Sequence, residues 1–190
     1  MVDIETSGLK PSESEILQIA MLEVIKDPRG YFYPGRSFEK ILHFDKEVTD
    51  EWILKTHKDL LPRCKAATYQ SPVEVRAEIV RFFQQTGQKN IYLMGLNASV
   101  FDYPWLVNKG YLKEGDVHYR IFELTGAYGL AQAVLHLNGD RADDRKTFFE
   151  MANGSCEWIE LPKGVSAHDA IYDCYSQLKT LNGCIKLLRK

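Results

Sequence analysis

The sequence predicts a single α/β domain built around a mixed five-stranded sheet with helices on both faces. Three strand-like segments come first, and strands and helices then alternate, which is typical of a sheet covered by helices. The chain has 190 residues, of which 45% are hydrophobic. That is enough for one core and does not require a second domain. We therefore expect residues 1–190 to form one domain, with residues 140–165 as a candidate flap or insertion.

Short apolar segments bounded by turn residues mark the first three strands. We expect these strands at residues 2–6, 16–25 and 37–44. Pro28-Arg29-Gly30 and Pro34-Gly35 are typical turn sequences and are expected to separate the second strand from the third. The first 44 residues are thus expected to supply three of the five strands.

Helical signals follow these strands. Residues 49–57 form a short helix candidate, and residues 72–85 carry a clearer helical pattern. The longer segment begins with a capping box at Ser71 and Glu74, with proline at the first helical position. Gly87 is expected to end this helix, because glycine readily adopts the left-handed conformation at a helix C-terminus.

The second half of the chain alternates strands and helices. Pro104 is expected in the first turn of a helix, where its missing N–H costs least. This places Asp102 at the carboxyl edge of the sheet, where α/β proteins usually build their sites. The expected elements are a buried strand at residues 90–96, a helix that ends at Gly110, a strand at residues 117–124, a helix at residues 127–137, and a last helix from near Ser166 to about Leu181.

Four carboxylates and one histidine stand in three separate segments. Asp3 and Glu5 share one face of the first strand, because side chains at i and i+2 project together with Cα atoms roughly 6.5 to 7 Å apart. That spacing suits two cations held about 3.5 to 4 Å apart. The other acids must come from other elements, and Asp102 and Asp173 are the candidates. With His168 as a general base, the set predicts a two-metal phosphodiesterase.

Each of these residues also has an ordinary interpretation. Asp3 and Glu5 would alone be surface charges on an edge strand, Asp102 a helix cap, and Asp173 a solvated helix acid. His168 would alone be a polar loop residue. It is five positions from Asp173, about 140° around a helix, so we expect His168 in the loop or first turn. The ordered combination of all five favours the nuclease interpretation.

The three segments resemble the signatures of a known enzyme family. Residues 3–9 read DIETSGL, residues 97–102 read NASVFD, and residues 168–173 read HDAIYD. They are similar to the three motifs of the DEDDh 3′–5′ exonucleases, which include proofreading exonucleases, oligoribonucleases and exonuclease-T-like enzymes. The motifs occur in the family order and frame nearly the whole chain. The resemblance implies a ribonuclease-H-like fold.

The resemblance also implies an activity. Asp3, Glu5, Asp102 and Asp173 would hold two Mg²⁺ or Mn²⁺ ions, and His168 would take the proton from the attacking water. Nucleoside 5′-monophosphates would be released from the 3′ end of single-stranded DNA or short RNA. A homodimer and a polymerase or repair partner are left open.

The resemblance further implies residues that contact the substrate. In the family, the turn after the first strand contacts the terminal nucleotide, which here indicates Thr6, Gly8 and Leu9. Asn97 and Phe101 are further candidates in the second motif. The ordinary interpretation of the turn is a strand exit, and that of Asn97 and Phe101 is packing at the end of the sheet.

Aromatic residues add further candidates. Trp52 and His57 resemble an oligoribonuclease segment, but Lys58-Asp59 follows where that segment has Ser-Gly, so the type of nucleic acid stays open. Three aromatic side chains could stack on bases: Tyr103, Trp105 and Tyr128. We favour core positions for all three.

Composition restricts the function classes further. The formal net charge is −2, which argues against tight nonspecific binding to long duplexes, since that needs many phosphate contacts from Lys and Arg. No charged-then-apolar leader precedes the first motif and the apolar runs are too short to span a membrane, so neither secretion nor a membrane partner is predicted. The four cysteines, predicted to be free thiols of a cytoplasmic protein, are Cys64, Cys156, Cys174 and Cys184.

Alternative functions remain at this stage. One is a catalytically silent nucleic-acid-binding or proofreading scaffold subunit of the same fold. Another is an endonuclease, which would require an open groove and usually lacks the loop histidine. A third is a protein whose acidic residues coincide by chance.

Overall fold

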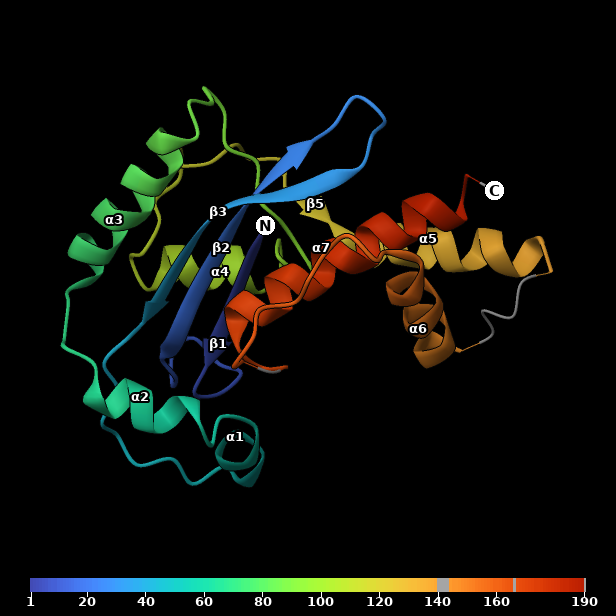
Figure 1. Cartoon of the computed structure of the whole chain (residues 1–190). Helices are drawn as coiled ribbons and strands as arrows, with labels where there is room; N and C mark the ends of the chain where they lie inside the picture. Colours follow the sequence, from blue (N-terminus) through green and yellow to red (C-terminus); the bar gives the residue numbers. More distant parts are fainter. Residues whose placement is uncertain (140–143, 166, 190) are drawn as a thin grey trace.

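The computed structural model describes residues 1–139, 144–165 and 167–189, and it has a mixed α/β architecture (Figure 1). Within these residues the strands form two sheets. The larger is antiparallel, with order β1-β2-β3, and the smaller is a parallel pair of β4 and β5. A single sheet of five paired strands, as expected from the sequence, is therefore not observed among the described strands.

The larger sheet follows the prediction closely. β1 spans Val2–Thr6 as predicted, and β2 spans Ile16–Lys26. β3 spans Phe32–Ile41 and not the predicted residues 37–44, so it begins five residues earlier and the prediction of a turn at Pro34-Gly35 is wrong. Pro34 pairs with Val24 next to a register shift in the β2–β3 ladder. Proline is tolerated there because β3 is an edge strand and the ladder is irregular.

The smaller sheet is shorter than predicted. β4 covers only Met94–Gly95 and β5 only Phe122–Glu123. Single backbone hydrogen bonds continue the pairing outside this ladder, from Phe122 N to Leu93 O at 2.9 Å and from His118 N to Ile91 O at 2.7 Å. The chain between these bonds does not keep a regular register, so the expected strands at residues 90–96 and 117–124 are reduced to two residues each.

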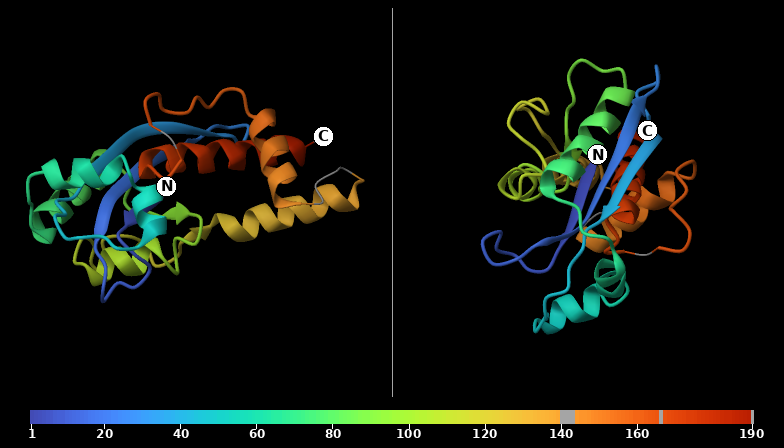
Figure 2. Two further views of the ribbon diagram at one scale, coloured as in Figure 1. Left: turned by 90° about the horizontal axis from the view of Figure 1, so that it is seen from below. Right: turned by 90° about the vertical axis from the view of Figure 1, so that its left-hand side faces the viewer.

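Helices cover both faces of β1–β3, as predicted (Figure 2). α3, at Pro72–Gln85, has the predicted bounds and the predicted capping box. It packs on the face formed by Ile19 and Met21. α7, at Ala170–Leu187, packs on the opposite face, where Ala20 and Leu22 lie. This alternation is what a strand buried on both faces requires.

The other helices agree with the sequence to different degrees. α2 was not predicted, and neither was α6, which falls in the segment interpreted as a candidate flap. Part of that segment, residues 140–143, lies outside the described residues, as does Ser166. The last helix, α7, begins at Ala170 and not near Ser166, and it continues to Leu187, past the predicted end at about Leu181. The bounds are Glu51–Thr56 for α1, Leu60–Ala66 for α2, Asp102–Asn108 for α4, Leu124–Leu137 for α5 and Arg145–Ser155 for α6.

α6 belongs to the core. Its Phe148 and Ala152 are buried against α7. At the crossing, a Cβ atom on Gly183 would lie 1.8 Å from the carbonyl oxygen of Ala152. Only glycine therefore permits this approach of the two backbones. The four cysteines are free, as predicted, and all four are buried. Among the described helices, none has the length and apolar character needed to cross a membrane.

Candidate active site

One open pocket of about 350 Å³ gathers all five predicted catalytic side chains. It lies where β1, the start of α4 and the start of α7 meet. Two predicted substrate-contacting residues line it as well. The pocket residues named by the sequence are Asp3, Glu5, Asn97, Phe101, Asp102, His168 and Asp173.

β1 supplies two of the acids by simple alternation. Asp3 and Glu5 point toward α7, while Ile4 between them is buried in the core on the α3 side. Glu5 is 9% exposed. β1 pairs with β2, with Asp3 opposite Ala20 and Glu5 opposite Gln18. The sequence spacing therefore places both carboxylates in the pocket as predicted.

Asp3 is held by a glutamine on α7. Gln177 donates from Nε2 to Asp3 Oδ1 at 2.9 Å and accepts from the backbone N–H of Leu96 at 3.2 Å. Gln177 thus connects β1 with the residue that follows β4. Burial raises the pKa of Asp3 well above its usual value, and the nearby charges of Asp102, Glu5 and Asp173 raise it further.

Asp102 is the first residue of α4 and is 3% exposed. Pro104 lies in the first turn of this helix, as predicted. Burial raises the pKa of Asp102 to about 7, although hydrogen bonds from its own N–H and from that of Ile4 oppose the increase. The contact with Ile4 brings the start of α4 against β1.

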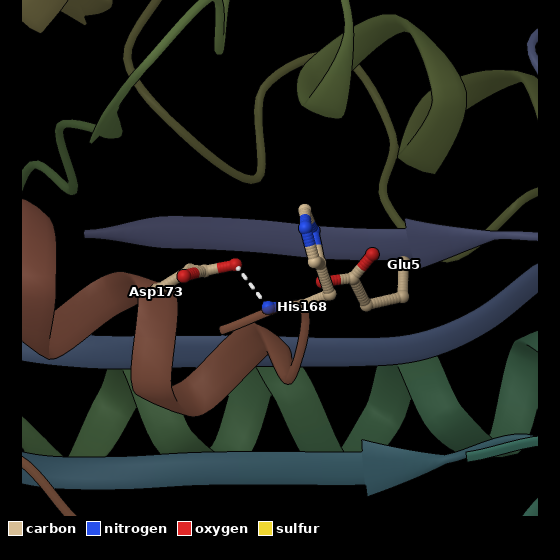
Figure 3. Close-up of side chains that lie close together, drawn as sticks. All are labelled: Glu5, His168 and Asp173. Atoms are coloured by element: carbon tan, nitrogen blue, oxygen red, sulfur yellow. Dashed lines mark hydrogen bonds between the residues drawn. The ribbon is translucent and has the colours of Figure 1, made fainter. Parts of the chain in front are cut away.

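Glu5, His168 and Asp173 form the tightest group in the pocket (Figure 3). One ligand atom from each residue lies within 4.8 Å of the others. His168 has φ of 66°, and its backbone N–H donates to Asp173 Oδ2 at 3.1 Å. It precedes Asp169, the N-cap of α7, so the prediction that His168 lies in the loop and Asp173 in the helix is confirmed.

The carboxylates repel one another in this pocket. Burial, followed by the charges of Asp173, Asp169 and Asp102, raises the pKa of Glu5 to about 8. Burial also raises the pKa of Asp173, against the N–H of His168. Oxygen ligands are what Mg²⁺ and Mn²⁺ prefer, and a cation would remove this repulsion. The donor set therefore fits divalent metal ions.

Two more side chains lie near the site: Trp52 in α1 and His57, the C-cap residue of that helix. His57 is 2% exposed, and its Nε2 lies 3.6 Å from Glu5 Oε2. Burial, together with the charge of His168, lowers the pKa of His57 to about 4. The Trp52 ring lies 6.1 Å from that of His168 and 6.2 Å from that of His57. The sequence signal for both was the resemblance of their segment to an oligoribonuclease segment, which the following Lys58-Asp59 weakened.

The predicted substrate-contacting residues divide into two groups. Asn97 and Phe101 line the pocket, and Asn97 Oδ1 accepts from Thr125 Oγ1 at 3.1 Å. Thr6, Gly8 and Leu9 are not among the lining residues. Thr6 donates from Oγ1 to the carbonyl of Gly8 at 2.7 Å, which holds the turn, and Leu9 is 78% exposed.

The aromatic residues considered for base stacking behave mainly as core. Trp105 and Tyr128 are buried, and Tyr103 is half-buried beside the same core as Trp105. Tyr128 donates its hydroxyl to the carbonyl of Gln177 at 2.6 Å. In the described structure they pack α4 and α5 against the core.

Comparisons with known proteins add no family. No protein-family model matches the sequence, and a search of curated proteins finds no match. Any assignment of function therefore depends on the three motifs and on the geometry of the pocket.

Proposed function

We propose that this protein is a metal-dependent 3′–5′ exonuclease of the DEDDh type, which releases nucleoside 5′-monophosphates from single-stranded DNA or short RNA. One observation carries the proposal. Four carboxylates and a histidine, drawn from β1, α4 and the start of α7, converge in one open pocket. If these five residues were only surface charges, a helix cap and a polar loop residue, they would have no reason to lie together.

The residues have distinct roles in this proposal. Asp3, Glu5, Asp102 and Asp173 would hold two Mg²⁺ or Mn²⁺ ions. When bound, such ions neutralise charge and polarise the scissile phosphate. His168 is exposed, lines the pocket, and takes a proton from the attacking water. Asp173 orients it through the hydrogen bond to its backbone N–H.

We further propose that the two sheets belong to one ribonuclease-H-like sheet with the order β3-β2-β1-β4-β5. A Cβ atom on Gly95 would lie 2.7 Å from the carbonyl oxygen of Val2. β4 therefore runs close beside β1, where the fourth strand of such a sheet would lie. Gln177, bonded to both Asp3 and Leu96, supports the same arrangement.

A substrate panel tests the function. Single-stranded DNA, single-stranded RNA and dinucleotides, each with a free or a blocked 3′ end, are incubated with Mg²⁺ or Mn²⁺. We expect stepwise loss from free 3′ ends only, abolished by EDTA. The relative rates rank DNA against RNA and long substrates against short ones, which defines the substrate class.

The main alternative is a catalytically silent nucleic-acid-binding subunit of the same fold. It predicts that folded, metal-loaded protein binds single strands but cleaves none of the panel. An endonuclease would instead cut substrates whose 3′ ends are blocked. Either result would contradict the exonuclease proposal.

A further inference from the structure

The residue after His168, Asp169, is anchored by side chains that lie outside the three motifs. Asp169 is 7% exposed, and both of its carboxylate oxygens are engaged. Arg63 of α2 donates from Nη1 to Oδ2 at 2.9 Å, and Gln18 of β2 donates from Nε2 to Oδ1 at 3.1 Å. Three elements from distant parts of the chain therefore meet beside the proposed base.

The network is reinforced on each side. Gln18 is fully buried, and its Oε1 accepts from the backbone N–H of Ala170 at 3.0 Å. Glu39 Oε1 of β3 accepts from Gln18 at 3.0 Å and from Arg63 at 3.1 Å. Arg63 thus bridges two carboxylates, while Gln18 fixes the first turn of α7 to the sheet.

His168 depends on such anchoring. It is exposed, and it adopts a left-handed backbone conformation that costs a non-glycine residue on the order of 1–2 kcal/mol. Within the described residues, His168 contacts the Trp52 ring, follows directly into Asp169, and donates its backbone N–H to Asp173. Asp173 is a proposed metal ligand. Asp169 is not, so its contacts can hold the His168 backbone whether or not metal is bound.

We propose that Arg63 is a positioning residue: its ion pair with Asp169 holds the His168 backbone so that the ring faces the carboxylates. α2 thereby fixes the geometry of a residue 105 positions away in sequence without touching the pocket. The catalytic part of this inference rests on the proposed function. The structural part, that Arg63 holds His168, does not.

The test uses variants that break the ion pair from either side. Arg63→Met removes the donor. Asp169→Asn removes the charge but keeps an oxygen that can cap α7, since asparagine is a good N-cap. Arg63→Lys keeps a cation that can pair with only one carboxylate at a time. Arg36→Met is the matched control, because Arg36 pairs with Glu23 at 3.0 Å elsewhere on the same sheet.

The first readout is independent of activity. In EDTA, the ring signals of ¹³C-labelled histidine are recorded, and that of His168 is assigned by its absence in His168→Ala. We expect the His168 signal to move toward the position of an unstructured histidine in Arg63→Met and in Asp169→Asn. Arg36→Met should leave it unchanged. An unmoved signal in both ion-pair variants overturns the inference.

The second readout is kinetic. Displacing a catalytic group by about 1 Å can cost roughly 100-fold in rate, so we expect kcat to fall about 10- to 100-fold in each single variant. The double variant should lose no more than the worse single, and KM should change less than about twofold. Arg63→Lys should recover part of kcat. Additive losses, or a loss in KM alone, contradict the positioning role.

The two readouts separate the possible failures. A wild-type protein without nuclease activity contradicts the proposed function, while the histidine signals still decide whether Arg63 holds His168. A shifted signal with unchanged kcat overturns the positioning role in catalysis. If Arg63→Met does not fold, Asp169→Asn carries both measurements, because its helix cap is retained.

Discussion

Glu5→Gln should stabilise the metal-free protein at alkaline pH. The environment raises the pKa of Glu5 from 4.5 to about 8. The folded protein therefore binds this proton more tightly than the unfolded chain, and stability falls as pH rises from 4.5 through 8. At about 1.4 kcal/mol per pKa unit, the ionised group costs up to about 5 kcal/mol above pH 8. Glutamine has nearly the same shape and cannot ionise.

The assay is denaturant unfolding in EDTA at pH 5 and pH 8.5. At pH 8.5 we expect the free energy of unfolding of Glu5→Gln to exceed that of the wild type by up to about 5 kcal/mol, or roughly 10 to 20 °C in Tm. At pH 5 the gain should shrink to about 1 kcal/mol, because the wild-type carboxyl is then mostly protonated in the folded state.

A control variant at another glutamate should change the free energy of unfolding in the opposite direction. A hydrogen bond from Lys40 lowers the pKa of Glu78 on α3. Glu78→Gln should therefore cost about 0.5 to 1 kcal/mol at pH 8.5, as for a surface ion pair. Mn²⁺ should stabilise the wild type more than Glu5→Gln. A Glu5→Gln protein that is less stable than the wild type at pH 8.5 in EDTA, or that gains the same stability at both pH values, would show that the Glu5 carboxylate does not destabilise the fold.

Three further predictions concern the base, a helix crossing and a metal ligand. His168→Ala should lower kcat by roughly 10² to 10⁴ while Mn²⁺ affinity measured by calorimetry stays unchanged; a collapse of affinity would make His168 a ligand. Gly183→Ala should cost about 3 kcal/mol or more in thermal unfolding, because its Cβ would meet the Ala152 carbonyl. Gly126→Ala, which has open space around it, should be neutral or stabilising, and equal effects would contradict this account. Asp102→Asn should weaken Mn²⁺ binding and lower kcat together, and unchanged values of both would remove Asp102 from the ligand set.

The elements with strong local signals could be predicted from the sequence. β1 and α3 were placed to the residue, because alternation and the capping box at Ser71 are local features. β4 and β5 were overestimated, since strand length depends on a partner about 28 residues away. α6 was missed because only Phe148 and Ala152 are buried on it, and its stability comes from packing on α7.

Residues of the site also divide into those that local sequence patterns reveal and those that only the fold brings together. The five proposed catalytic residues could be found because their motifs are short and ordered along the chain. His57 could not be assigned with them, because its contact with Glu5 joins residues 52 positions apart and appears only in the fold. The ion pair of Arg63 and Asp169, which joins residues 106 positions apart, leaves no pattern that local spacing can reveal.

The exonuclease activity is tested most directly by product analysis on a single-stranded substrate labelled at its 3′-terminal nucleotide. Wild-type protein is compared with Asp102→Asn, in Mn²⁺ and in EDTA. We expect the first labelled product to be a nucleoside 5′-monophosphate, formed by the wild type in Mn²⁺ and lost in EDTA and in the variant. Internal fragments, or equal release by both proteins, would contradict the exonuclease proposal.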